Sequence, residues 1–165
     1  MGSLQEACTM AIKMELSRIF IQEMADVQII ELSEVDGSRS FPIVVGLPEA
    51  FAIQRRLKGI EVPRPQTHDL LASVIEAMDG ALVEIRINDL ADGTFFANLI
   101  IEHNGRILEI DSRPSDAIAV GIALNVPIFV AERVLDQLEI DPSIQADIDA
   151  FDDLPESSDD DDIFG

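Results

Sequence analysis

The chain has 165 residues, 47% of them apolar, and its only aromatic residues are eight Phe, so it suits one domain with a mainly aliphatic core. Its single cysteine, Cys8, excludes an intrachain disulfide framework and a cysteine metal cluster. The net charge of −21 argues against the overall basic surface by which nucleic-acid-binding proteins usually hold phosphates.

The two ends of the sequence differ from its middle. Residues 1–13 show no clear period and no secretory signal, and we expect a mobile N-terminal arm. Residues 139–165 hold 11 of the 32 acidic residues and no Lys or Arg, and we expect a disordered acidic tail. Residues 14–138 form the expected folded domain. No apolar run approaches the ~18–20 residues of a membrane span, so we expect a cytoplasmic protein with no membrane partner.

The first half of the domain predicts three strands and then a helix. The strands cover 14–22, 27–32 and 40–46, with a turn at Asp36-Gly37, and they suit an antiparallel meander. Pro42 places the third strand at a sheet edge or marks the start of that strand. A helix is predicted over 48–58, since Pro48 suits a first helical turn and Gly59 suits the position after the end.

The second half predicts a helix over 67–78, with Thr67 as its N-cap, and a second meander. Its strands cover 82–88, 94–102 and 106–110, joined by turns at Asp92-Gly93 and Asn104-Gly105. Residues 117–124 are apolar on every side, which predicts a buried helix. A short strand over 126–130 and a helix over 131–138 follow. The expected class is α+β, with mixed or antiparallel sheets of about seven strands and three to four helices, one of them central and buried.

Two segments of the chain echo each other, one beginning at Arg64-Pro65 and the other at Arg113-Pro114. Each continues through a hydroxyl residue and an Asp into an apolar helix. Backbone N–H groups and the helix dipole favour an anion at such a helix start. The Asp of the same segment can fill that role by capping the helix and pairing with the Arg, so both interpretations stay open.

In the functional interpretation these side chains make a site for metal-assisted phosphodiester hydrolysis. A divalent cation, Mg²⁺ or Mn²⁺, activates water and neutralises charge in such a reaction, while arginines contact the phosphate oxygens. The candidate metal ligands are Asp69, Asp111, Asp116 and Glu49. The candidate general base or further ligand is His68, and the candidate phosphate clamps are Arg64 and Arg113. His103 is expected to be an exposed loop residue.

The densest basic cluster is Arg55, Arg56 and Lys58, near the end of the first helix. It suits either the negative C-terminal end of the helix dipole or contact with phosphate.

Four motifs, in order and spacing, resemble the bifunctional nuclease domain family over roughly residues 14–138. They are Pro42-Ile43-Val44-Val45-Gly46 with Glu49-Ala50, Arg64-Pro65 with Thr67-His68-Asp69-Leu70-Leu71, Asp111 to Ile118, and Pro127-Ile128-Phe129-Val130. The resemblance implies an α+β domain, a homo-oligomer and nuclease activity on both DNA and RNA. The candidate metal ligands, base and phosphate clamps lie within these motifs, together with Ser115: Glu49, Arg64, His68, Asp69, Asp111, Arg113, Ser115 and Asp116.

Two alternatives to a nuclease remain. In one, the chain is a non-catalytic oligomeric interaction or regulatory module, whose polar motif residues act as helix caps and ion pairs. In the other, the two Arg-Pro helix starts form a pocket for a small molecule or anion.

Overall fold

The computed structural model describes residues 11–22, 24, 27–140, 149–150 and 153. Within these residues the chain forms seven strands and four helices: β1 (Ala11–Phe20), β2 (Gln28–Glu34), β3 (Ser40–Val45), α1 (Leu47–Leu57), α2 (Thr67–Ala77), β4 (Gly80–Ala91), β5 (Thr94–His103), β6 (Arg106–Ser112), α3 (Pro114–Leu124), β7 (Ile128–Ala131) and α4 (Glu132–Ile140). The predicted α+β class is confirmed.

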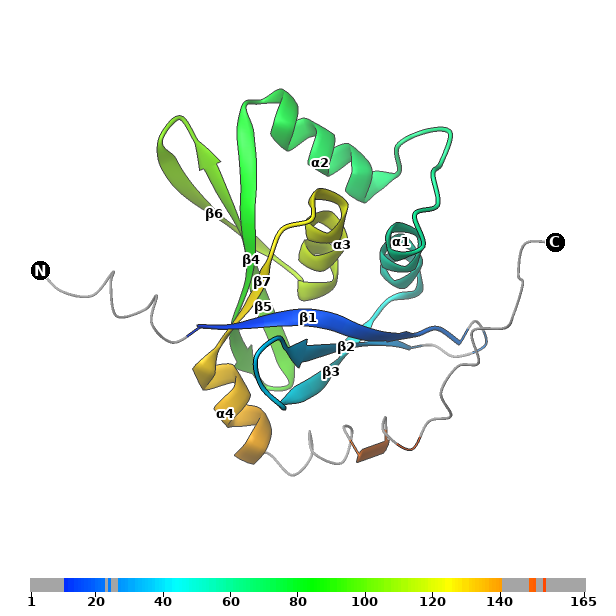
Figure 1. The fold of residues 1–165 in the computed structure, drawn as a ribbon, viewed down its shortest axis with the longest axis vertical. Helices are drawn as coiled ribbons and strands as arrows, with labels where there is room; N and C mark the ends of the chain where they lie inside the picture. Colours follow the sequence, from blue (N-terminus) through cyan, green and yellow to red (C-terminus); the bar gives the residue numbers. More distant parts are fainter. Residues whose placement is uncertain (1–10, 23, 25–26, 141–148, 151–152, 154–165) are drawn as a thin grey trace, which may run out of the picture.

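All seven strands belong to one mixed sheet, in the order β3-β2-β1-β7-β4-β5-β6 (Figure 1). Both predicted meanders are present as antiparallel neighbours. The short strand β7 joins them, because it pairs antiparallel with β1 and parallel with β4. β3 is an edge strand, as Pro42 predicted.

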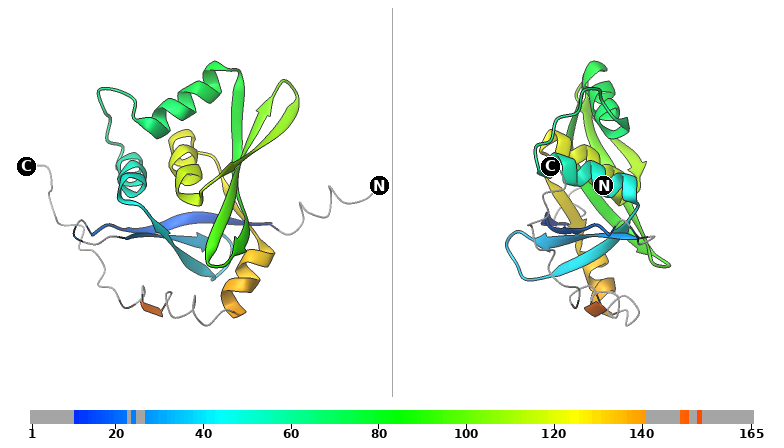
Figure 2. Two further views of the ribbon diagram at one scale, coloured as in Figure 1. Left: turned by 180° about the vertical axis from the view of Figure 1, so that it is seen from behind. Right: turned by 90° about the vertical axis from the view of Figure 1, so that its right-hand side faces the viewer.

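The sheet bends strongly, so that β1–β3 run across the direction of β4–β6 (Figures 1 and 2). Phe41 of β3 stacks on Phe95 of β5, with ring centroids 5.5 Å apart, although these strands are not neighbours in the sheet. The bend therefore encloses a core between the two meanders. Its fully buried side chains include Ile30, Leu32, Ile87 and Val130.

The helix α3 is buried, as its continuous apolar sequence predicted. The side chains of Ala117, Ile118, Ala119 and Val120 are almost wholly inaccessible to solvent. Gly121 lets this helix approach the sheet closely, since a Cβ there would lie 2.8 Å from Cγ1 of Ile85 on β4.

The helices α1, α2 and α3 gather on one side of β1–β3, and α4 lies on the other side (Figures 1 and 2). Arg39, after β2, ties α4 to this sheet region through ion pairs with Glu34 and with Glu132 at the start of α4. No helix among the described residues is long and apolar enough to cross a membrane.

Some local predictions were wrong or lie outside the described residues. The N-cap residue of α2 is Gln66, so Thr67 does not cap this helix, and the N-cap residue of α3 is Arg113. His103, expected in an exposed loop, is the half-buried last residue of β5. Most of the predicted arm 1–13 and most of the predicted tail 139–165 lie outside the described residues. The parts that are described belong to β1, which begins at Ala11, and to α4, which ends at Ile140, apart from 149–150 and 153.

Candidate functional site at three helix starts

The helices α1, α2 and α3 each carry an acidic side chain in their first turn. These are Glu49, Asp69 and Asp116. A carboxylate is favoured there, because the backbone N–H groups of the first turn and the helix dipole both attract negative charge. Local helix chemistry therefore explains why acids stand at these three positions.

A continuous chain of polar contacts connects the three helix starts. Arg113, directly before α3, donates from Nη2 to Oε1 of Glu49 at 2.9 Å and from Nε to Oδ2 of Asp116 at 2.7 Å. The other oxygen of Asp116, Oδ1, lies 2.9 Å from Nε2 of His68 on α2. The two echo segments thus converge, with a carboxylate from one segment bonded to an imidazole from the other.

The members of this polar chain differ in exposure. The side chains of Glu49 and His68 are 13% and 15% exposed, whereas that of Arg113 is 65% exposed. Arg113 is therefore the cation that an incoming ligand reaches first, and His68 lies deeper. The Asp116 carboxylate between them is 29% exposed.

The charged form of Asp116 is favoured by its neighbours. Burial alone would raise the pKa of this carboxyl, but hydrogen bonds from Arg113 and His68 outweigh it, so the pKa lies below its ordinary value. In return, hydrogen bonds to Asp116 and Glu49 raise the pKa of Arg113. Asp116 is therefore an ionised carboxylate at neutral pH.

The contact between His68 and Asp116 sets the orientation of the imidazole ring. When Nε2 carries the ring proton, it donates a hydrogen bond to Asp116. The lone pair that can accept a further proton is then on Nδ1. A carboxylate that fixes one ring nitrogen in this way prepares the histidine to act as a base through the other nitrogen.

Asp69 has different partners, although it is adjacent to His68 in the sequence. Its carboxylate is buried, accepts a hydrogen bond from the backbone N–H of Gln66 at 2.9 Å, and pairs with Arg55 at 3.0 Å and with Arg56. Asp69 thus caps its own helix, as the structural interpretation of that motif expected, but it pairs with Arg55 and Arg56 of α1 and not with Arg64.

The structure places the candidates Asp111 and Arg64 apart from this chain of contacts. Asp111 on β6 is exposed and opposite Asn98, which is opposite Arg86 on β4. Residues that pair directly across neighbouring strands share a face of the sheet, so Asp111 lies on the same face as Arg86. The helix α3 packs against Ile85, on the other face. Arg64 is exposed and forms none of the hydrogen bonds or ion pairs found among the described residues.

No group of three His, Cys, Asp or Glu side chains gathers to hold a metal ion among the described residues. Of the four predicted metal ligands, only Glu49 and Asp116 share a neighbour, and that neighbour is Arg113. A Mg²⁺ ion at a phosphate-processing site commonly uses one or two carboxylates together with water and substrate oxygens. Glu49 and Asp116 supply two carboxylates, and both accept hydrogen bonds from the Arg113 guanidinium.

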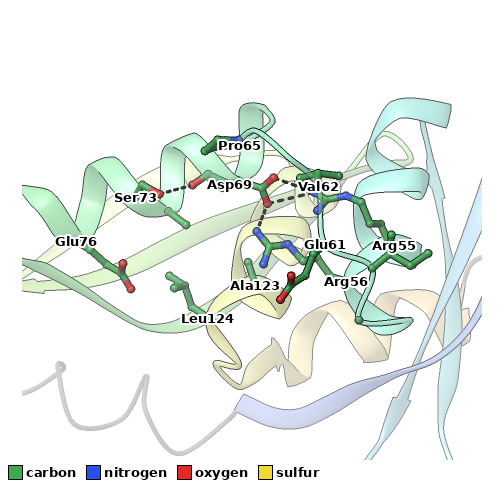
Figure 3. Close-up of a pocket in the computed structure, with 13 residues that line it drawn as sticks. Arg55, Arg56, Glu61, Val62, Pro65, Asp69, Ser73, Glu76, Ala123 and Leu124 are labelled. Atoms are coloured by element: carbon green, nitrogen blue, oxygen red, sulfur yellow. Dashed lines mark hydrogen bonds and ion pairs between the residues drawn. The ribbon is translucent and has the colours of Figure 1, made fainter.

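Sequence reasoning did not find the partners of Asp69. Arg55 and Arg56 looked like cations at a helix end, yet both guanidinium groups point to one buried carboxylate on the next helix (Figure 3). Their adjacency in the sequence was the only signal, and it does not say which way α1 faces.

Residues 30–143 match the model of the bifunctional nuclease domain. The chain therefore belongs to the bifunctional nuclease domain family, as its motifs predicted.

Relatives of the chain occur in bacteria and plants. A Mycobacterium tuberculosis protein named only as uncharacterized is 41% identical over 119 residues, which cover 72% of this chain and 71% of that protein. Bifunctional nuclease 1 of Oryza sativa is 27% identical over 118 residues, covering 69% of this chain and 36% of the plant protein. Bifunctional nuclease 2 of the same plant is 29% identical over 114 residues, covering 67% and 35%.

Proposed function

We propose that the chain hydrolyses phosphodiester bonds in DNA and RNA, at the site formed by His68, Asp116, Arg113 and Glu49. The observation that carries the proposal is that Asp116 holds His68 with one oxygen and an exposed Arg113 with the other. A base and a phosphate-binding cation thereby lie on the two sides of a single carboxylate. Membership of a family named for nuclease activity supports the same reaction class.

In this proposal His68 removes a proton from a water molecule, and Asp116 stabilises the imidazolium that forms. The water oxygen attacks phosphorus, and the P–O bond to the leaving nucleotide breaks. Arg113 donates hydrogen bonds to the non-bridging oxygens, where negative charge develops. Water is the nucleophile because a reaction common to DNA and RNA cannot use the 2′-hydroxyl group, which DNA lacks.

We also propose that Mg²⁺ or Mn²⁺ assists, and Glu49 and Asp116 are the residues that would hold it. Such an ion would lower the pKa of bound water and neutralise phosphate charge. Divalent cations would also reduce the repulsion between the substrate and residues 1–138, which hold 21 of the 32 acidic residues against 11 basic ones. The roles of Asp69, Asp111 and Arg64 in catalysis stay predictions.

The test is cleavage of an end-labelled single-stranded RNA and of the DNA of the same sequence, in Mg²⁺, in Mn²⁺ and in EDTA. We expect cleavage with either metal ion and a loss of about 100-fold or more in Asp116→Asn, which removes the charge that holds His68 and Arg113. Asp136→Asn is the matched control, because Asp136 is exposed on α4, across β1–β3 from α1, α2 and α3. Equal rates for the two variants would contradict the assignment.

We further propose that the protein works in the cytoplasm as a homo-oligomer. An oligomer is supported by the edge strand β6, which exposes the apolar side chains of Ile107, Leu108 and Ile110. Open apolar edges of this kind are usually covered by another chain.

A second candidate function is the non-catalytic interaction or regulatory module. It is favoured by the observation that His68, Asp69, Arg113 and Asp116 all have partners within the structure. In that case the purified wild-type protein would cleave neither RNA nor DNA in Mg²⁺ or Mn²⁺. Cleavage by the wild type that is lost in a folded Asp116→Asn variant would decide for the nuclease.

A further inference from the structure

A cleft of about 570 Å³ opens between the end of α1, the connection to α2, α2 itself and the end of α3 (Figure 3). None of His68, Arg113, Asp116 and Glu49 lines it. The cleft is therefore separate from the proposed hydrolytic site, although Asp69, the sequence neighbour of His68, forms part of its wall. Its volume lies in the range of about 300–1,000 Å³ that is usual for small-molecule sites.

Two arginines and one carboxylate meet at one end of the cleft. Nη2 of Arg55 lies 3.2 and 3.0 Å from the two oxygens of Asp69, and Nη2 of Arg56 contacts the first of these oxygens. Each guanidinium group carries five N–H donors, and Asp69 engages only Nη2 of each residue. One carboxylate thus faces two cations, and donors on both remain for a second anion.

The partial burial of these two arginines leaves one donor without a partner and disfavours the charge of one guanidinium group. Nε of Arg55 is buried and has no hydrogen-bond partner among the described residues. Burial, and secondarily the charge of Arg55, lower the pKa of Arg56. A buried donor without a partner and two adjacent like charges both cost free energy, and a bound anion would relieve the repulsion between the two charges.

The remainder of the cleft is suited to a flat, partly polar group. Val62 and Pro65 from the connection, with Leu124 from α3, supply apolar surface. The carboxylates of Glu61 and Glu76 also line the cleft, and Figure 3 shows Glu76 on the side away from the arginines. The carboxylate of Glu76, on that far side, can accept hydrogen bonds from amino groups such as those of nucleobases.

We propose that this cleft binds a nucleoside monophosphate, with its phosphate on Arg55 and Arg56 and its base against the apolar wall. The ligand is either a free nucleotide or the 5′-terminal nucleotide of a strand, since both present the same phosphate and base. The inference goes beyond hydrolysis, because binding in the cleft requires neither His68 nor a metal ion.

The test is isothermal titration calorimetry in EDTA, using the full chain with His68→Asn so that no ligand is cleaved. The ligands are AMP, adenosine, inorganic phosphate and the 5′-phosphorylated dinucleotide pApA. We expect AMP to bind at least tenfold more tightly than adenosine or phosphate alone. Comparable affinity for pApA identifies a strand terminus as an acceptable source, and affinity for AMP alone identifies the free nucleotide.

Arg56→Gln should weaken AMP binding at least tenfold, the size expected for one charge-assisted hydrogen bond to phosphate. Arg55 keeps its pair with Asp69 in this variant, so the buried carboxylate retains a partner. Arg106→Gln, an exposed arginine on β6, is the matched control and should change the affinity less than twofold. Ala123→Phe fills the cleft without changing a charge and should also abolish AMP binding.

Three results would overturn the proposal: no heat of binding for AMP at millimolar concentration, equal affinities in Arg56→Gln and Arg106→Gln, or phosphate binding as tightly as AMP. Since the titration needs no cleavage, an inactive nuclease with a filled cleft is distinguishable from an active nuclease with an empty one.

Discussion

Asp116 gives the candidate site a dependence on pH, because its neighbours hold its pKa below the ordinary value. A carboxyl whose pKa is lowered by folding stabilises the folded state fully above its unfolded pKa of about 3.9, and this contribution disappears as the pH falls through the folded-state pKa. Asp116→Asn should therefore lower the free energy of unfolding by about 1 kcal/mol at pH 7, and this difference should shrink as the pH falls below the unfolded pKa.

Urea unfolding followed by circular dichroism at pH 7 and pH 3 checks this expectation. The chain has no Trp or Tyr, so intrinsic fluorescence is not a suitable probe. Asp136→Asn, on the exposed face of α4, should leave the free energy of unfolding unchanged. A deficit in Asp116→Asn that is equally large at pH 3 and pH 7 would show that its ionic partners do not stabilise the fold.

Residue types at the helix starts were predictable from the sequence, and their partners were not. The echo segments predicted that His68 and Asp116 stand at two helix starts, because capping and dipole chemistry act within a few residues. Which carboxylate meets which cation depends on how the helices cross. For that reason the sequence predicted Asp69 and Asp116 in one metal site, whereas in the structure Asp69 forms ion pairs with Arg55 and Arg56.

At the scale of elements, α3 determines the geometry of the site because it is held firmly on β4. Gly121→Ala gains up to about 1 kcal/mol of helix propensity, but the added Cβ meets Ile85 at 2.8 Å. Ile85 is fully buried on β4, and overpacking of such a core typically costs about 1–3 kcal/mol. We expect a net loss of about 1 kcal/mol, measured by urea unfolding. An equal or higher stability would show that α3 has room to move.

The elements themselves were largely predictable, because each has a local signal. Asp92-Gly93 and Asn104-Gly105 adopt the positive φ angles that tight hairpin turns need, and both hairpins form. The position of β7 between β1 and β4 had no such signal. It depends on contacts between Met14, Ile85 and Ile128, which are far apart in the sequence.

At the scale of the whole molecule, the two edges of the sheet make the proposed oligomer testable. On β6, Ile107 is 57% exposed, and on the opposite edge strand β3, Val44 is 63% exposed. A lysine on an edge strand opposes pairing with another chain. Ile107→Lys should therefore shift the sedimentation coefficient to that of a monomer, whereas Val44→Lys should leave it unchanged. If Val44→Lys dissociated the oligomer and Ile107→Lys did not, the interface would lie on β3 and the proposal for β6 would be wrong.

The most direct test of the proposed hydrolysis compares the only two histidines of the chain. Cleavage of labelled single-stranded RNA and DNA is measured for the wild type, for His68→Asn and for His103→Asn, with circular dichroism confirming that each is folded. His68 contacts Asp116 between helix starts, while His103 ends β5 beside a hairpin turn. Loss of a general base predicts a rate about 100-fold or more lower in His68→Asn and a nearly wild-type rate in His103→Asn. Equal rates for folded His68→Asn and wild type would contradict the proposed site.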